Sequence, residues 1–277
     1  MHDVIVVGSG LFGSIISRHL RCLGMDVHVV DDRRPNAGSA PAACLMKPSW
    51  LSSLTKEQIS ASMSVLDRLY RISTLNFEVQ ALRGKVTSSD VFWVDPRDVF
   101  NNVLDRNACV RRVDAGTVVT ENGFILEARH IIVAAGIWTQ SLLPSIKQRG
   151  LVGAACLWRG GHIGQPFIRP WAPFKQIVAF NRGDGLWVGD GSAIKLENWT
   201  DERQALTVDR CASAVLGQVK GLPDNSLRVM RGIRPYAKGR PYILEETSPG
   251  VWAASGGAKN GTAAAGYVAH ELGERLS

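Results

Sequence analysis

The sequence has few cysteines, and they do not form pairs. The five are odd in number and scattered, and none lies in a CxxC motif: Cys22, Cys44, Cys109, Cys156 and Cys211. This arrangement argues against a disulfide framework and against a cysteine-based zinc site. It is typical of cysteines that serve as small buried hydrophobic residues.

Long apolar runs and the signatures of several enzyme classes are also missing. No run approaches the roughly 18 residues that span a bilayer, so no membrane partner is expected. The first apolar run starts beside Met1 and leaves no room for a signal peptide, so we expect a cytoplasmic protein. There is no HExxH motif, metal-ligand cluster or obvious catalytic triad. No metal is expected, and this sequence suits chemistry supplied by an organic cofactor.

Positive charge is in excess. The chain has 32 Lys and Arg against 25 Asp and Glu, a net charge of +7, and a pI near 9.4. Such a balance favours nucleic acid, another polyanion or an anionic surface as partner, although many soluble enzymes are basic without one. Eight tryptophans are present, several beside Lys, Arg or Pro. They can stack bases, or they can line the core or a pocket.

The most specific pattern lies near the N-terminus. An apolar run, His2–Val7, leads into the turn Gly8-Ser9-Gly10-Leu11-Phe12-Gly13, and a helical stretch follows from residue 14 to about 23. A second apolar run, Val27–Val30, ends at Asp31. This order of strand, glycine turn, helix, strand and acid predicts a dinucleotide-binding unit.

Each residue type in this pattern has a physical role. Gly8 permits the tight turn, Gly10 lets the backbone approach a pyrophosphate, and Gly13 lets the helix pack on the strand. The helix N-terminus offers free N–H groups to the phosphates, and Asp31 can accept hydrogen bonds from ribose hydroxyls.

The identity of the dinucleotide depends on the rest of the chain. Arg33 and Arg34 follow the acid, where an arginine can serve the phosphate of NADP. Later segments favour FAD instead. In order they are Ala37–Ala43, Val94–Arg97, Ala128–Thr139, Arg231–Tyr236, Gly239–Ile243 and Ala254–Thr262. Together they resemble the motifs of the D-amino-acid oxidase and glycine oxidase family, whose cofactor is FAD.

The resemblance implies an α/β fold. A Rossmann-like FAD-binding domain of the GR2 type is interleaved with a smaller, mainly antiparallel β-sheet substrate domain. Residues 1–78, 94–150 and 230–277 are expected to form the FAD-binding domain, and residues 79–93 and 151–229 the substrate domain. Periodicity predicts helices over 55–75, 95–107, 201–219 and 261–276, the first with a capping box of Thr55 and Gln58. Hairpin turns are predicted at 122–123 and 181–185.

The motif and the resemblance together give a set of expected cofactor contacts. They are Gly8, Gly10, Leu11, Phe12, Gly13, Asp31, Asp32, Ser39, Ala40, Ala135, Gly136, Trp138, Gly232, Gly256, Gly257, Lys259, Asn260, Gly261 and Thr262.

The resemblance also implies the chemistry. Oxidases of this family remove hydride from the carbon next to an amine, the imine hydrolyses in water, and dioxygen is the electron acceptor. Arg234 matches the arginine of the family's GLRP motif and is expected to bind a substrate carboxylate, unless it is structural or faces phosphate. Lys259 stands where glycine oxidase carries an arginine. It is expected to be a catalytic residue, either as a second cation for the carboxylate or as a helper in dioxygen activation beside the flavin, unless it is a solvated lysine.

Further substrate contacts are expected from Tyr236, His162 and Trp50. One departure concerns residues 177–180, where family members often place a tyrosine over the substrate and this chain has none. That departure argues against free glycine or a small D-amino acid as substrate.

Framework, charge and tryptophan content suggest one hypothesis. The chain resembles the oxidase domain of the bifunctional tRNA wobble-uridine enzyme and the phage flavoenzymes of thymidine hypermodification. The resemblance implies oxidation of glycyl-thymidine in DNA to glyoxylate and 5-aminomethyl-deoxyuridine, on a flipped-out nucleotide, in the host cytoplasm if a phage encodes the chain. The alternatives are an oxidase of free glycine, sarcosine or another small amino acid, a flavin-binding assembly protein without turnover, and an NADP reductase.

Overall fold

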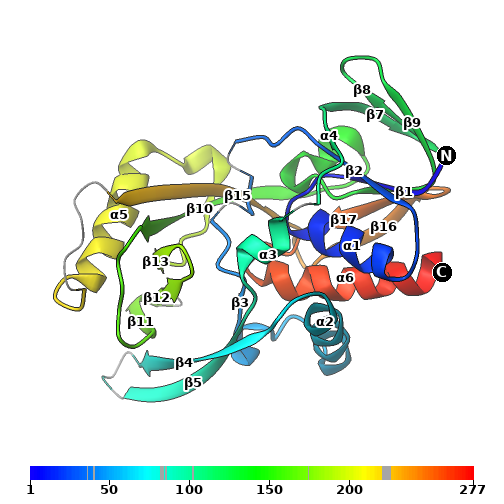
Figure 1. Cartoon of the computed structure of the whole chain (residues 1–277). Helices are drawn as coiled ribbons and strands as arrows, with labels where there is room; N and C mark the ends of the chain where they lie inside the picture. Colours follow the sequence, from blue (N-terminus) through cyan, green and yellow to red (C-terminus); the bar gives the residue numbers. More distant parts are fainter. Residues whose placement is uncertain are drawn as a thin grey trace.

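The computed structural model describes residues 1–35, 37–39, 41–81, 84, 86–101, 103–173, 175–219 and 226–277. Two β-sheets lie side by side, and helices cover each of them (Figure 1). One sheet carries a parallel, Rossmann-like core and the other is mainly antiparallel, so the expected α/β fold class is confirmed. No helix in the described ranges is long and apolar enough to cross a membrane.

The first sheet has eight strands. Its main path runs β16 (Ile243–Ser248), β17 (Val251–Ser255), β9 (Ile125–Val133), β1 (His2–Val7), β2 (Val27–Asp31) and β6 (Arg106–Asn107). The path from β17 to β6 is parallel, β16 is antiparallel to β17, and β7 (Val110–Asp114) and β8 (Thr117–Thr120) extend antiparallel from β9. The predicted turn at 122–123 joins β8 to β9.

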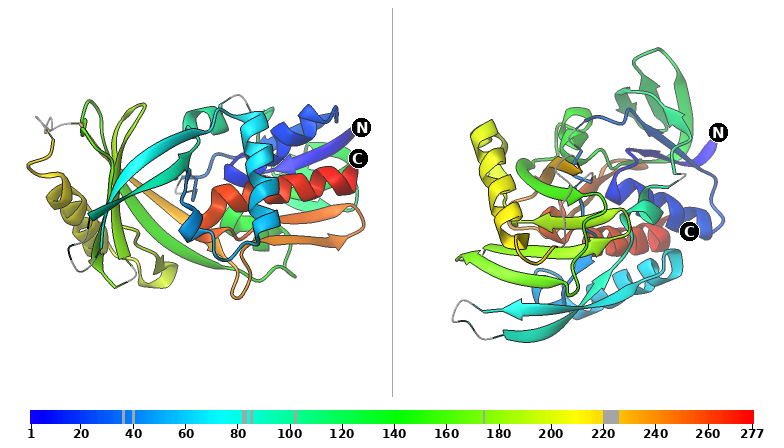
Figure 2. Two further views of the ribbon diagram at one scale, coloured as in Figure 1. Left: turned by 90° about the horizontal axis from the view of Figure 1, so that it is seen from below. Right: turned by 60° about the vertical axis from the view of Figure 1, so that its left-hand side comes forward.

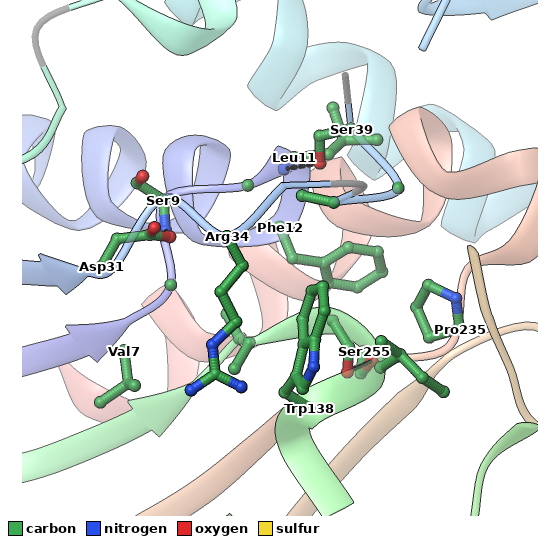
Figure 3. A pocket seen from close by; sticks show the side chains of 18 of the residues that line it. Val7, Ser9, Leu11, Phe12, Asp31, Arg34, Ser39, Trp138, Pro235 and Ser255 are labelled. Carbon is green, nitrogen blue, oxygen red and sulfur yellow. Dashed lines mark hydrogen bonds between the residues drawn. The ribbon is translucent and has the colours of Figure 1, made fainter. Parts of the chain in front are cut away.

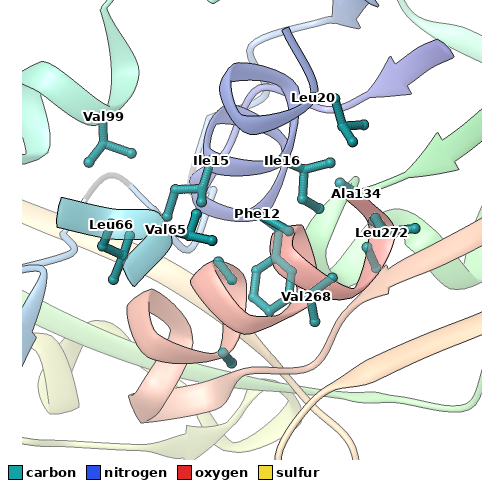
Figure 4. Packing of buried hydrophobic residues seen from close by; sticks show 14 of the residues in the cluster. Phe12, Ile15, Ile16, Leu20, Val65, Leu66, Val99, Ala134, Val268 and Leu272 are labelled. Carbon is teal, nitrogen blue, oxygen red and sulfur yellow. The ribbon is translucent and has the colours of Figure 1, made fainter. Parts of the chain in front are cut away.

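Side chains of β1 alternate between two hydrophobic cores. Val4 and Val6 face the helices α1 (Leu11–Cys22), α2 (Lys56–Leu69) and α6 (Gly261–Leu276), whose apolar residues pack together (Figure 4). Ile5 and Val7 face a second cluster on the opposite side of the sheet. This period-two pattern is why a fully apolar strand is stable at the centre of a covered parallel sheet.

Three of the predicted helices are shorter than expected, and the one over 201–219 ends at Val215. The capping box of Thr55 and Gln58 begins α2, but the helix ends at Leu69 because the β-branched stretch that follows pairs with a neighbouring strand from Ser73 onward. The predicted helix over 95–107 was wrong beyond one turn, α3 (Pro96–Phe100). Asp105 accepts a hydrogen bond from the backbone N–H of Val29 at 2.7 Å, which draws this segment to the sheet edge as β6.

The second sheet has nine strands. They run β14 (Ile194–Lys195), β10 (Arg149–Trp158), β13 (Gly185–Gly189), β12 (Lys175–Arg182), β11 (Phe167–Ala172), β4 (Ser73–Gln80), β5 (Val86–Trp93) and β3 (Leu45–Met46), with β15 (Leu227–Tyr236) also paired to β10. Among the described strands of this second sheet, only β11 and β4 pair in parallel. The hairpin at 181–185 is confirmed, and α5 (Asp201–Val215) covers the sheet (Figure 2).

The two sheets exchange segments along the chain. β3 and β4 lie in the second sheet, although the expected division places β3 and β4 up to residue 78 in the FAD-binding domain. The domain boundaries themselves stay a prediction. β15 connects the two halves, because Ile233 bridges to Ala37 and Tyr236 bridges to Gly257. Its C-terminal end therefore lies at the junction, between the loop at 37–39 and the segment that leads into α6.

Candidate active site

A cavity of about 740 Å³ opens along the carboxyl ends of β1, β2 and β9 (Figure 3). In an α/β sheet this edge is where ligands bind. The glycine turn, the end of β2, the loop at 37–39, the turn at 134–138 and residues 233–235 of β15 line it. Of the expected site residues it brings together Gly8, Gly10, Leu11, Phe12, Asp31, Asp32, Ser39, Ala135, Gly136, Trp138, Arg234, Gly257 and Gly261.

The glycine turn has little room for any other residue. Gly8 has φ +107°, a conformation that side chains rarely adopt. A Cβ on Gly13 would lie 1.7 Å from the carbonyl oxygen of Gly8, so α1 approaches the turn as closely as backbone allows. A Cβ on Gly10 would lie 2.9 Å from Oγ of Ser39, which accepts a hydrogen bond from the backbone N–H of Leu11 at 2.8 Å. Ser39 thus satisfies one of the free N–H groups of the first turn.

Asp31 stabilises the same turn through hydrogen bonds to the backbone. Its Oδ2 accepts a hydrogen bond from the backbone N–H of Ser9 at 2.5 Å, and its Oδ1 accepts one from the backbone N–H of Arg33 (Figure 3). Each carboxylate oxygen has a second lone pair, so the group can still accept from ribose hydroxyls. The sequence pattern predicted the ribose contact but not the bond to the turn.

We expect Asp31→Ala to weaken cofactor retention. Loss of the charged acceptor for Ser9, together with any ribose contact, should raise the dissociation constant of FAD by about tenfold or more, since a hydrogen bond to a charged group contributes about 1.5–3 kcal/mol. The flavin content after dialysis, followed by titration of the apoprotein with FAD, measures this. Asp26→Ala removes an exposed carboxylate at the other end of β2 and should leave retention unchanged. Full occupancy in Asp31→Ala would contradict both roles of the residue.

Arg34 and Trp138 face each other across the cavity (Figure 3). The guanidinium of Arg34 lies 5.4 Å from the ring centroid of Trp138. It also donates to Asp32 and to the Sγ of Cys109, the latter at 3.1 Å. The bond to Asp32 raises the pKa of Arg34. This arginine is thus held in place by its own neighbours.

The loop that contains Gly38 and Ser39 is packed between α1 and β15. A Cβ on Gly38 would lie 2.5 Å from the carbonyl oxygen of Ile233, and one on Gly232 would lie 2.7 Å from the Pro41 ring. These contacts explain why glycine is needed at both positions. Gly232 does not line the cavity, and Ala40 lies outside the described residues. The clamp brings Arg234, two residues further along β15, to the cavity wall.

Several expected site residues lie off this cavity. They are Trp50, His162, Gly13, Gly232, Tyr236, Gly256, Lys259, Asn260 and Thr262. The side-chain amide of Asn260 donates to the carbonyl of Trp50 at 3.0 Å and to Oγ of Ser53 at 3.2 Å, which ties the start of α6 to the loop before α2. His162 is exposed, and its Nε2 lies 3.4 Å from the amide nitrogen of Asn181, so it belongs to a surface loop.

Arg234 has the environment of an anion-binding group. Its Nη1 donates to the carbonyl of Ser192 at 2.9 Å, and its guanidinium packs against Gly153, where any Cβ would lie 2.4 Å from Nη2. Burial lowers the pKa of Arg234, and the charge of Asp190 partly opposes this. Among the described residues the other N–H groups of the fork have no partner. They are available to a carboxylate, which a guanidinium can bind through two parallel hydrogen bonds.

Lys259 lies close to Arg234. It belongs to the short helix η4 (Ala258–Asn260) at the start of α6, and its side chain remains exposed. Partial desolvation is the largest cause that lowers the pKa of Lys259, followed by the charge of Arg234. The two cations therefore repel each other, which favours an anion beside them.

Family comparison agrees with this geometry. A model of the DAO family, described as FAD dependent oxidoreductase, matches residues 97–275. The chain belongs to the DAO family. No curated protein sequence matched this DAO-family enzyme. Three solved structures share its fold: glycine oxidase from Bacillus cereus ATCC 14579 (TM-score 0.73, 14% identity, covering 100% of this chain and 95% of that one), iminodiacetate oxidase from Chelativorans sp. BNC1 (0.72, 16%, 98% and 94%) and glycine oxidase from Geobacillus kaustophilus (0.71, 15%, 99% and 95%).

The cofactor of this DAO-family enzyme is FAD. The residues present fit it, because Gly8, Gly10 and Leu11 line the cavity and Asp31 retains free lone pairs. The turn and the N-terminus of α1 would hold the pyrophosphate, and Asp31 would hold a ribose. When bound, FAD accepts a hydride from carbon.

Proposed function

We propose that this enzyme oxidises the glycine α-carbon of glycyl-thymidine in DNA, in which glycine is joined through its nitrogen to the 5-methyl carbon of the base. The observation that carries the proposal is Arg234, a half-buried arginine with free N–H groups at the cavity wall. It supplies the anchor that a glycine carboxylate needs. The names of two structural neighbours, both glycine oxidases, support an amine of this kind.

The proposed reaction is a two-electron oxidation followed by a hydrolysis. The glycine α-carbon would lose a hydride, which bound FAD would accept, and the amine would lose a proton, so that the C–N single bond would become an imine. Water adds to the imine carbon, and the C–N bond breaks. The products are glyoxylate and 5-aminomethyl-deoxyuridine, which remains in the DNA. Dioxygen takes the two electrons and two protons and becomes hydrogen peroxide.

The chain's own residues would bind and orient the substrate. Arg234 would fix the carboxylate so that the α-carbon points into the cavity, and Lys259 would add a second positive charge beside it. Orientation of this kind supplies several kcal/mol of a reaction barrier. No acid–base pair is needed, because the imine hydrolyses with water.

The basic balance of the chain supports a nucleic-acid substrate. A net charge of +7 attracts the phosphate backbone, and a base must leave the stack to enter a protein cavity. We place this activity in the cytoplasm, that of the host if a phage encodes the chain.

The DNA proposal predicts a strong dependence on salt. The logarithm of the apparent affinity for glycyl-thymidine DNA should fall linearly with the logarithm of salt concentration, with a slope of about −0.7 to −0.9 per phosphate contacted. Flavin reduction measured at a series of salt concentrations gives this slope. A slope near zero would indicate that no backbone phosphate is bound.

The alternative is oxidation of free glycine, sarcosine or another small amino acid. Anaerobic mixing of the holoenzyme with glycine, sarcosine and glycyl-thymidine DNA distinguishes the two through bleaching of the yellow flavin absorbance. Bleaching by the DNA alone supports the proposal. Bleaching by the small amines and not by the DNA would make this a metabolic oxidase and would overturn it.

A further inference from the structure

Positive charge around Arg234 exceeds the negative charge that could balance it. Arg234 lies on β15, Lys259 in η4 and Lys175 at the start of β12, and Asp190 directly follows β13. In the part of the chain that the structure describes, no carboxylate lies within ion-pair distance of any of these three cations. Three elements distant in sequence therefore contribute unpaired cations to one region.

Asp190 is already committed to other partners. It is fully buried, and its Oδ1 accepts a hydrogen bond from the backbone N–H of Ser192 at 2.8 Å. Its Oδ2 accepts hydrogen bonds from Nη1 of Arg210 at 2.7 Å and from Oγ1 of Thr207 at 3.2 Å. A buried carboxylate with this set of donors is balanced by the arginine it contacts. Among the described residues it forms an ion pair with Arg210 and with neither Lys175 nor Lys259.

Trp171 fixes Lys175 in this region. The indole Nε1 donates to the carbonyl of Asp190 at 2.8 Å, so the ring is tied to the segment whose Ser192 carbonyl holds Arg234. The guanidinium of Arg210 lies 4.1 Å from the ring centroid, and Nζ of Lys175 lies 4.9 Å from it. Both distances suit cation–π attraction, which favours this position of the exposed lysine.

Lys259 is tied to the same region, because Gly257, two residues before it, bridges to Tyr236 at the end of β15. The charges of Arg234 and Lys175 add to desolvation in lowering the pKa of Lys259, and the charge of Asp190 opposes them. One carboxylate on Arg234 would leave the two ammonium groups without an anion. A substrate with a second anionic group would satisfy them.

We propose that Lys175 and Lys259 form a second anion-binding subsite beside Arg234, which binds a phosphate group of the substrate nucleotide. This inference rests on the proposed function and names the feature of the substrate that the same site reads. Both lysines are exposed, so a polymer backbone can reach them, whereas Arg234 is half-buried. An ammonium group is a compact point charge that suits phosphate, and the guanidinium fork suits the carboxylate.

A binding measurement tests the subsite without turnover. The holoenzyme is titrated with thymidine 5′-monophosphate and with thymidine, and perturbation of the flavin spectrum or heat release gives each dissociation constant. The monophosphate should bind about tenfold more tightly, as expected for one charge-assisted contact. Lys175→Gln should remove most of this preference. Lys147→Gln is the matched control, because Lys147 is an exposed lysine that donates only to the carbonyl of Pro144 among the described residues.

Two results would overturn the subsite. One is equal binding of the two ligands by the unaltered enzyme, and the other is a preference that Lys175→Gln retains. Inorganic phosphate as competitor separates the sources of the anion: it should displace the monophosphate at high concentration, whereas an oligonucleotide should compete at far lower concentration.

Measurements of flavin reduction distinguish a failure of the phosphate subsite from a failure of the proposed reaction. Preference for the monophosphate without flavin reduction by any glycyl-thymidine compound would leave the subsite standing and remove the proposed reaction. Reduction of the flavin by the glycyl-thymidine nucleoside and by its 5′-monophosphate with equal kcat/KM would support the proposed reaction and overturn the phosphate subsite.

Discussion

Gly13→Ala is expected to yield an enzyme with lower thermal stability and little bound FAD. The new Cβ would lie 1.7 Å from the carbonyl oxygen of Gly8 and 3.3 Å from a methyl group of Val6. The first of these atoms is backbone, so α1 and the turn must move apart. Overpacking of this kind costs about 3 kcal/mol at the upper end of its usual range. For a chain of this size that corresponds to a melting temperature lower by roughly 5–10 °C.

Substitutions at two further glycines distinguish an effect on thermal stability from an effect on FAD binding. Gly164→Ala is the matched control, because a Cβ there meets no atom within 4 Å, and it should leave both properties unchanged. Gly10→Ala meets only the movable side chain of Ser39, so it should preserve the melting temperature of the apoprotein but weaken FAD binding. Thermal melts of apoprotein and holoenzyme measure both effects. A Gly13→Ala protein with unaltered melting temperature would show that the tight approach of α1 is unimportant.

Arg234→Ala is expected to reduce kcat/KM for glycyl-thymidine DNA by about ten- to a hundredfold. The physical reason is the loss of a charged hydrogen-bonded contact with the carboxylate, about 1.5–3 kcal/mol. Arg234→Lys keeps the charge but loses the two parallel hydrogen bonds, so its kcat/KM should fall between that of the unaltered enzyme and that of Arg234→Ala. Steady-state kinetics with each variant give these ratios.

A substrate analogue makes the Arg234 prediction specific. With a methyl group in place of the carboxymethyl group, the substrate has nothing for Arg234 to bind, and the unaltered enzyme and Arg234→Ala should differ little. Arg228→Ala, an exposed arginine on the same strand, serves as control for the loss of one positive charge. If Arg234→Ala slowed both substrates equally, the arginine would act on structure and not on the carboxylate.

Local patterns accounted for most of the fold. The strand, glycine turn and helix at the N-terminus depend on short-range sterics, and so do the turn at 122–123 and the capping box of Thr55. The final helix, α6, has the predicted bounds of Gly261–Leu276. In each of these the residues that determine the structure lie within a few positions of one another.

The sequence-based predictions failed where contacts with residues distant in the sequence determine the local structure. The segment after Phe100 has helical spacing but is held in the sheet by contacts of Asp105 with β2. The ring of Trp171, the buried Asp190 and Arg210 come from three separate elements, and no spacing in the sequence links them. Gly232 was expected beside the cofactor, whereas its visible constraint is the packing of Pro41.

Product analysis tests the central claim most directly. The holoenzyme is incubated in air with an oligonucleotide that contains one glycyl-thymidine, and glyoxylate, hydrogen peroxide and the nucleosides of the digested DNA are quantified. The account predicts equal amounts of glyoxylate, hydrogen peroxide and 5-aminomethyl-deoxyuridine. Unchanged glycyl-thymidine from an enzyme that oxidises free glycine or sarcosine under the same conditions would contradict it.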